Sequence, residues 1–182
     1  MMITDIVSTR FILLILFTGV VVLSSSVENF CEHINCDFQH GSLCHYANSR
    51  AIGPEITKPW IIRQIRMHSA GTDKRHYCNS FAAAYLDSKD TALMETVKRM
   101  ASPATIRFKY YEATNGVQLL VCCGDPRPEA CSFKSNLGVT PEDHNWQTGM
   151  AKCPAGTDKI VFVAINSGEE EGVVSVDDIE CA

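Results

Sequence analysis

Apolar residues in the central part of the chain recur with a period of two, the period of a β-strand that buries one of its faces. Residues 105–111 place Ile106, Phe108 and Tyr110 on one face and two basic residues on the other. Residues 117–123 also alternate, with Val117, Leu119, Val121 and Cys123 on one face and Gln118, Leu120 and Cys122 on the other. We therefore predict two strands here.

Asn115 and Gly116 separate these two runs. An Asn-Gly pair between alternating runs is the strongest short-range signal for a β-hairpin. The pattern therefore predicts that the two strands pair with each other, with room for a loop longer than two residues.

Further strands follow from the remaining apolar runs. Residues 159–165 are apolar on both faces, as in a central strand, and an acidic turn at 168–172 leads to a last strand at 173–181. We expect two more strands, at 60–67 and near Cys36. Together these runs predict an all-β fold, an antiparallel, jelly-roll-like β-sandwich.

One stretch, residues 91–100, fits two interpretations. Leu93, Val97 and Met100 are spaced as on one face of a helix, and Asp90 is placed to cap its first turn. The neighbouring pattern instead favours a strand. The sequence therefore allows either a helix or a strand here.

The N-terminus has the features of a secretory signal peptide. Residues 11–23 form an apolar run that a helix would extend over about 20 Å, less than the roughly 30 Å hydrocarbon core of a membrane. Ser24 and Ser26 supply the small residues of a cleavage site. We expect residues 1–26 to be removed, leaving one secreted, extracellular domain, 27–182, with no membrane span. The alternative is an uncleaved membrane anchor.

Charge and cysteine content narrow the class further. The net charge of −5 and the absence of a Lys/Arg block disfavour nucleic acid as a partner. Nine cysteines behind a signal peptide indicate a disulfide framework. Because the count is odd, at least one thiol is left unpaired or joins another chain, which would permit a homodimer.

The adjacent Cys122 and Cys123 lie on a predicted strand, so their side chains should point to opposite faces. One of the two is expected to bond Cys131 across a short loop, and we assign this bond to Cys123. The other, with Cys78 and Cys153, supplies one more bridge and the odd thiol.

Several motifs occur in a recognisable order along the chain. They are Cys36-Asp37-Phe38-Gln39, Leu43-Cys44-His45-Tyr46, Phe108-Lys109-Tyr110 with Gly116 and Leu119-Leu120-Val121, then Trp146, and finally Asp177-Asp178-Ile179. In this order the chain resembles the MAM domain of meprins, neuropilins and receptor tyrosine phosphatases. Gln39 stands where an acid is usual, and the cysteines outnumber the usual four, so a divergent member is implied.

The resemblance implies a β-sandwich with a role in adhesion, recognition and self-association rather than in catalysis. It also implies a disulfide between Cys36 and Cys44. For Cys31 and Cys181, which flank the first and last predicted strands, we expect a clasp across the two termini.

The last predicted strand contains two adjacent acids. If it alternates regularly, Asp178 shares a face with Val174 and Val176, and a carboxylate directed at apolar surroundings needs partners. Backbone N–H groups or a basic side chain would serve. No other cofactor is expected, but the resemblance implies calcium, present in some members of the family, with Asp37 as a second ligand.

No catalytic motif is present in the sequence, and we expect a protein that is not an enzyme. Cys122 and Cys123 have acidic neighbours instead of the groups that stabilise a thiolate. The run Glu169–Glu171 in a Gly-flanked turn is expected to be the solvated tip of a hairpin.

The function expected from the sequence is therefore extracellular recognition or adhesion through a protein partner or self-association. The alternative is a lectin-like jelly roll that binds a glycan through Trp60, Tyr85 or Trp146. A secreted hydrolase is a third, weaker reading.

Overall fold

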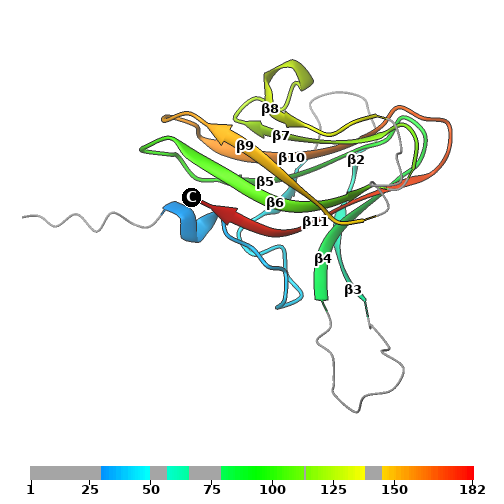
Figure 1. Cartoon of the computed structure of the whole chain (residues 1–182), viewed down its shortest axis with the longest axis horizontal. Coiled ribbons are helices and arrows are strands. Elements are labelled where there is room, and N and C mark those ends of the chain that lie inside the picture. The colour runs from blue at the N-terminus through cyan, green and yellow to red at the C-terminus, as the bar shows by residue number, and fades with distance from the viewer. Residues whose placement is uncertain (1–29, 50–56, 66–78, 113, 138–144) are drawn as a thin grey trace, which may run out of the picture.

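The computed structural model describes residues 30–49, 57–65, 79–112, 114–137 and 145–182. These residues form two β-sheets packed face to face, so the chain is an all-β sandwich (Figure 1). The predicted signal peptide lies outside the described residues. Within them, no helix is both long and apolar enough to span a membrane.

The strands divide between two sheets that we call sheet I and sheet II. Sheet I contains, in spatial order, β1 (Ala47–Ser49), β5 (Thr91–Val97), β10 (Lys159–Asn166), β7 (Val117–Cys123) and β8 (Cys131–Lys134), with β2 (Thr57–Lys58) beside β5. Sheet II contains β3 (Trp60–Ile65), β4 (Asn79–Leu86), β11 (Gly172–Cys181), β6 (Ala104–Glu112) and β9 (Gln147–Cys153). Among these strands all neighbours are antiparallel except β2 and β5. Two short 3₁₀ helices, η1 (Phe30–His33) and η2 (Pro128–Ala130), complete the described elements.

The period-two pattern of the sequence places the core between the sheets. Ile106, Phe108 and Tyr110 of β6 all point into it, as predicted. β10 lies in the middle of sheet I and is buried on both faces, which confirms it as a central strand. Burial of such side chains is the main favourable term in folding.

Residues 91–97 form a strand, so the helical interpretation of this stretch is wrong. β5 lies between β1 and β10 and hydrogen-bonds to both. Its Ala92 and Met94 belong to the core between the sheets, whereas Leu93 packs on the outer side of sheet I. Pairing on both edges and burial on both faces therefore override a local helical propensity.

The predicted hairpin at Asn115-Gly116 is also wrong, because β6 belongs to sheet II and β7 to sheet I. The turn crosses from one sheet to the other. Gly116 has φ of +87°, and its carbonyl accepts hydrogen bonds from the N–H and hydroxyl of Ser167 at 2.8 and 3.0 Å. A Cβ on Gly116 would lie 2.5 Å from Cα of Gly168, so close packing of two turns requires glycine there.

The turn that carries Glu169–Glu171 is solvent-exposed, as predicted, but it is not a hairpin tip. It joins β10 in sheet I to β11 in sheet II. The turn at 87–90, between β4 and β5, crosses between the sheets as well, and the Ser88 hydroxyl donates to the carbonyl of Gly168 at 2.7 Å. These crossing turns lie at one end of the sandwich (Figure 1).

The structure has four disulfides among its described residues. They are Cys31–Cys181, Cys36–Cys44, Cys122–Cys131 and Cys123–Cys153. The first two are the expected pairings.

The choice of Cys123 for Cys131 is corrected by the structure. Cys122 points to the outer side of sheet I, directly opposite Cys131 in the register of β7 and β8. Cys123 points between the sheets and bonds Cys153 on β9, so this bridge joins sheet I to sheet II. Cys78 lies outside the described residues.

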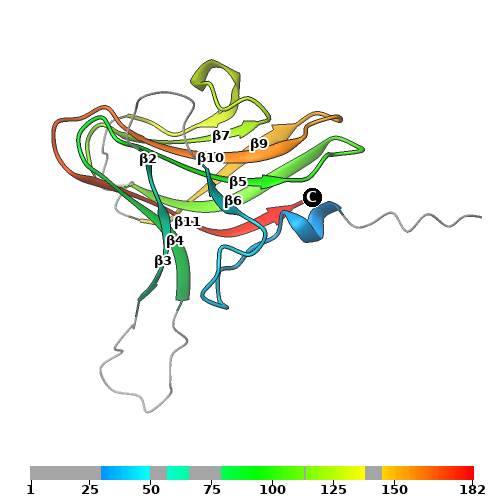
Figure 2. The same cartoon turned by 180° about the vertical axis from the view of Figure 1, so that it is seen from behind.

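No regular strand forms near Cys36, contrary to prediction. Cys36 makes one isolated antiparallel bridge to Ile179 of β11. Close by, η1 lies beside the C-terminal end of β11 and is bonded to it through Cys31–Cys181 (Figure 2). The two ends of the domain are therefore clasped together as expected, but without a first strand.

Candidate functional site

A bulge in β11 changes the orientation expected for the two adjacent acids. The register of β11 on β6 shifts between Asp177 and Glu180, and Asp178 has φ of +46°. Val176 faces the core before the shift and Ile179 faces it after. Asp178 is thus an extra residue that does not share the inner face, which corrects the regular alternation assumed for it.

Asp178 forms an ion pair with Lys109, whose Nζ lies 2.6 Å from its Oδ2. This partner is a basic side chain, one of the two kinds expected. The same contact raises the pKa of Lys109, because the carboxylate stabilises the protonated amine.

Asp177 is the acid that is buried, with 8% of its surface exposed. Its Oδ1 accepts the backbone N–H of Asp178 at 2.8 Å. Burial raises the pKa of Asp177 to about 6, while that N–H and the charge of Lys109 act in the opposite direction.

The residues proposed for calcium do not fit such a site. Asp37 Oδ1 accepts the backbone N–H of Gln39 at 3.1 Å, and Asp178 is paired with Lys109. Among the described residues, no group of three or more His, Cys, Asp or Glu side chains is arranged to hold a metal. Calcium prefers six to eight oxygen ligands, which this pair of acids does not approach.

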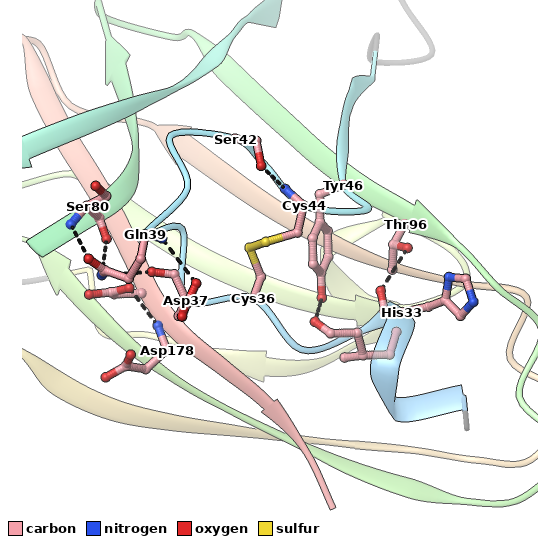
Figure 3. The surroundings of a disulfide bond; sticks show 12 residues. His33, Cys36, Asp37, Gln39, Ser42, Cys44, Tyr46, Ser80, Thr96 and Asp178 are labelled. Atoms are coloured by element: carbon pink, nitrogen blue, oxygen red, sulfur yellow. Dashed lines mark hydrogen bonds between the residues drawn. A yellow bond between two sulfur atoms is a disulfide. The ribbon is translucent and has the colours of Figure 1, made fainter. Parts of the chain in front are cut away.

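Gln39 makes hydrogen bonds that an acid at this position would lack. Its Oε1 accepts the N–H of Ser80 at 3.4 Å, and its Nε2 donates to the carbonyls of Ser80 at 3.3 Å and Asp37 at 3.0 Å (Figure 3). A carboxylate would lose both donated bonds. The amide therefore fastens the loop after Cys36 to the first residues of β4.

The three aromatic residues considered for ligand contact lie in different places. Trp60 is 1% exposed and belongs to the core between the sheets, so it contacts no ligand. Tyr85 is 49% exposed and Trp146 is 41% exposed. Tyr85 shares the outer side of β4 with Phe81, whose ring Trp146 contacts.

We call the outer side of sheet II the open face. It comprises Arg63, Phe81, Tyr85, Lys109, Tyr111, Trp146, Thr148 and Asp177. The ring of Trp146 meets that of Phe81 edge-on at 5.5 Å and that of Tyr111 at 6.0 Å. The guanidinium of Arg63 lies 4.9 Å from the centre of the Tyr85 ring.

Beside Trp146 the open face is hollowed into a pocket of about 300 Å³. Its lining residues are Gln39, Lys109, Trp146, Thr148, Asp177 and Asp178. Sequence reasoning singled out Trp146 and Asp178 but missed the rest. Lys109 and Thr148 carried a signal, since both fall on the solvent side of alternating strands.

The cysteines and glutamates considered for catalysis are either in disulfides or exposed to solvent. Cys122 and Cys123 are both in disulfides and so offer no thiolate. Glu169–Glu171 are exposed at the end of the sandwich where the turns cross between sheets.

Comparisons with known proteins identify the fold. No protein-family model matches the sequence, and no curated protein matches it. Among solved structures, the K1 cleaved adhesin domain of Lys-gingipain from Porphyromonas gingivalis aligns with a TM-score of 0.57 and 12% identity over 81% of this chain and 96% of that one. The K3 adhesin domain gives 0.56 and 14% over 81% and 97%. TmCBM61 in complex with β-1,4-galactotriose gives 0.51 and 13% over 85% and 97%. At these identities the likeness is one of fold, and this chain shares the β-sandwich of those domains.

Proposed function

We propose that this protein is an extracellular, non-catalytic recognition module that binds its ligand on the open face of sheet II. The observation that carries the proposal is the pair of exposed aromatic side chains, Tyr85 and Trp146, on that face. Aromatic residues with one apolar surface and one polar edge are enriched at binding surfaces. Charged side chains beside them, such as Lys109, can orient the bound ligand.

The comparisons support a binding role. Two of the similar structures are described as adhesin domains, and a third is a carbohydrate-binding module in complex with an oligosaccharide. The resemblance to MAM domains, which we propose as the affiliation of this chain, also favours adhesion. The ligand class is accordingly an extracellular protein or a glycan.

The extracellular location rests on two features. The four disulfides among the described residues are typical of an oxidising compartment. The predicted signal peptide at residues 1–26 would direct the chain there. Expression in a eukaryotic secretory system should place the protein in the medium with its N-terminus near Val27, and retention on the membrane with Met1 intact would contradict this.

The binding role can be tested with variants of the open face. The secreted protein should bind members of a panel of extracellular proteins and glycans, and the double variant Tyr85→Ala/Trp146→Ala should lose that binding. Leu137→Ala is the matched control, because Leu137 is an exposed apolar residue, at 52%, that is not part of the open face. Equal binding by both variants would refute the site, and turnover of a bound glycan or peptide would refute the non-catalytic role.

Self-association is a second candidate because of the cysteine count. Eight of the nine cysteines are bonded to one another in the structure, so a covalent homodimer that keeps those bridges would have to use Cys78. Non-reducing electrophoresis of the secreted protein should then show a dimer that Cys78→Ser abolishes. A monomer in both samples, by electrophoresis and light scattering, would rule out this mode of association.

A further inference from the structure

We propose that the pocket beside Trp146 holds one neutral sugar ring of a glycan ligand. The inference deepens the proposed function, on which it rests, by naming the ligand class of the open face. The pocket, of about 300 Å³, is at the small end of ligand sites, which run from roughly 300 to 1,000 Å³. This size suits a single ring rather than an oligosaccharide.

Trp146 supplies a platform for the apolar face of such a ring. Its indole is 41% exposed, and contacts with Phe81 and Tyr111 fix its orientation without covering it. The C–H groups on one face of a pyranose are apolar, and an aromatic surface buries them at little conformational cost because the indole is already held.

Asp177 supplies a hydrogen-bond acceptor at the bottom of the pocket. Although 92% of the residue is buried, only its Oδ1 has a partner, the N–H of Asp178, and its Oδ2 bonds to none of the described residues. Asp177 lines the pocket and its Oδ2 is not fully buried, so this oxygen can accept a hydrogen bond from a sugar hydroxyl.

The ion pair of Lys109 and Asp178 supplies polar groups at the rim. The distance from Lys109 Nζ to Asp178 Oδ2 is 2.6 Å, and an ammonium group has three donors, so donors remain for ligand oxygens. The bulge at Asp178 places this carboxylate beside the pocket instead of along the regular strand.

Charge complementarity favours a neutral ring. Asp177 and Asp178 face the single cation of Lys109, so the lining has an excess negative charge. An anionic sugar such as a sialic acid would be repelled. An uncharged hexose can donate a hydrogen bond to Asp177, form hydrogen bonds with Lys109 and Asp178, and stack on Trp146.

The two tryptophans make a direct test possible. Trp146 is exposed and Trp60 is buried, so acrylamide should quench mainly Trp146 in the folded, secreted protein. Methyl glycosides of galactose, glucose, mannose, fucose and N-acetylglucosamine are the probes, with the methyl glycoside of N-acetylneuraminic acid as the anionic comparison. At least one neutral glycoside should shield Trp146, and the anionic one should not.

Variants then assign the contacts. Lys109→Ala and Asp177→Asn should each lower the affinity for the glycoside that shields Trp146 about ten-fold. This is the loss expected when one hydrogen bond to a charged group is removed. Lys134→Ala, which removes an exposed lysine from β8 in sheet I, should have no effect. Melting curves identify any variant that fails to fold.

Three results would overturn the inference, and the first two differ in what they say of the proposed function. If no neutral glycoside shields Trp146 while Tyr85→Ala/Trp146→Ala still abolishes binding to another ligand, the sugar pocket is wrong and the recognition module stands. If the double variant also changes nothing, both are wrong. Shielding by the anionic glycoside alone would contradict the proposal that the bound sugar is neutral.

Discussion

Sheets I and II both bury their inner sides in one core, but their outer sides carry different side chains. The outer side of sheet I is aliphatic: Leu93, Leu120, Cys122, Val161 and Val163 form a second apolar cluster, each at most 5% exposed. The open face of sheet II instead carries aromatic and charged residues, of which Tyr85 and Trp146 are exposed. We call the sheet I side the covered face.

The covered face is closed in part by the chain itself. The loop at 124–127, with η2 and β8 after it, is held in place by the Cys122–Cys131 bridge, whose two cysteines pack in the cluster. A groove of about 720 Å³ remains between this loop and the aliphatic residues Leu93, Val163 and Ile165. Burial of aliphatic side chains is non-directional, so any covering segment of the chain can provide it. Aromatic rings held in one orientation beside charged groups are instead suited to a specific partner. The difference suggests that one outer side serves stability and the other serves recognition.

Truncating one residue on each face should show the largest difference between the two faces. Leu120→Ala should lower the free energy of unfolding by about 3 kcal/mol, because it leaves a cavity at a fully buried position. Tyr85→Ala should lower it by about 1 kcal/mol or less. Denaturant unfolding of the two variants checks the pair, and equal losses would contradict the assignment of roles.

The disulfide of the covered face should have the next largest effect. Replacing Cys122 and Cys131 together by Ala removes a bridge across a separation of nine residues, worth about 2 to 3 kcal/mol in the loop-entropy model. The unfolding midpoint should fall, and ligand binding on the open face should be unchanged. A loss of binding by the folded variant would show that the two faces are coupled.

The buried acid of the open face predicts a pH dependence of opposite sense to that of most paired carboxylates. The pKa of Asp177 is raised from its ordinary value of 3.8 to about 6, so its stabilising contribution is complete below pH 4 and is lost as the pH rises through 6. Asp177→Asn keeps an oxygen for the N–H of Asp178 and carries no charge. At pH 7.5 it should be more stable than the parent by about 1 to 3 kcal/mol, and at pH 3.5 the gain should vanish.

A stabilised Asp177→Asn variant that binds sugar less well would place this residue among those that lower stability for the sake of a binding site. Melting curves across the pH range, run beside the quenching assay, provide both measurements. A gain in stability that is equal at pH 3.5 and 7.5 would contradict the role of the buried charge.

Calcium should have the smallest effect. Because Asp37 and Asp178 have other partners, millimolar calcium should shift the melting temperature of chelator-treated protein by no more than about 1 °C. A shift of several degrees that is lost in Asp178→Asn would show that Asp178 does take part in a calcium site.

The features that depend on neighbours along the chain could be predicted from the sequence. Alternation identified β6, the double-sided apolar run identified β10, and the opposite directions of Cys122 and Cys123 required two different partners for them. These features are local because a strand directs successive side chains to opposite sides whatever it pairs with.

The pairing of the strands and the exposure of side chains to solvent could not be predicted in this way. β6 and β7 have the alternation and the Asn-Gly turn of a hairpin, but each finds its hydrogen-bond partners in a different sheet. Trp60 and Trp146 are the same residue type, yet one is in the core and the other beside a pocket. One extra residue at Asp178 reverses the alternation of β11, so Ile179 instead of Asp178 faces the core. Pairing, burial and bulges depend on contacts between segments far apart in sequence, which a local period does not encode.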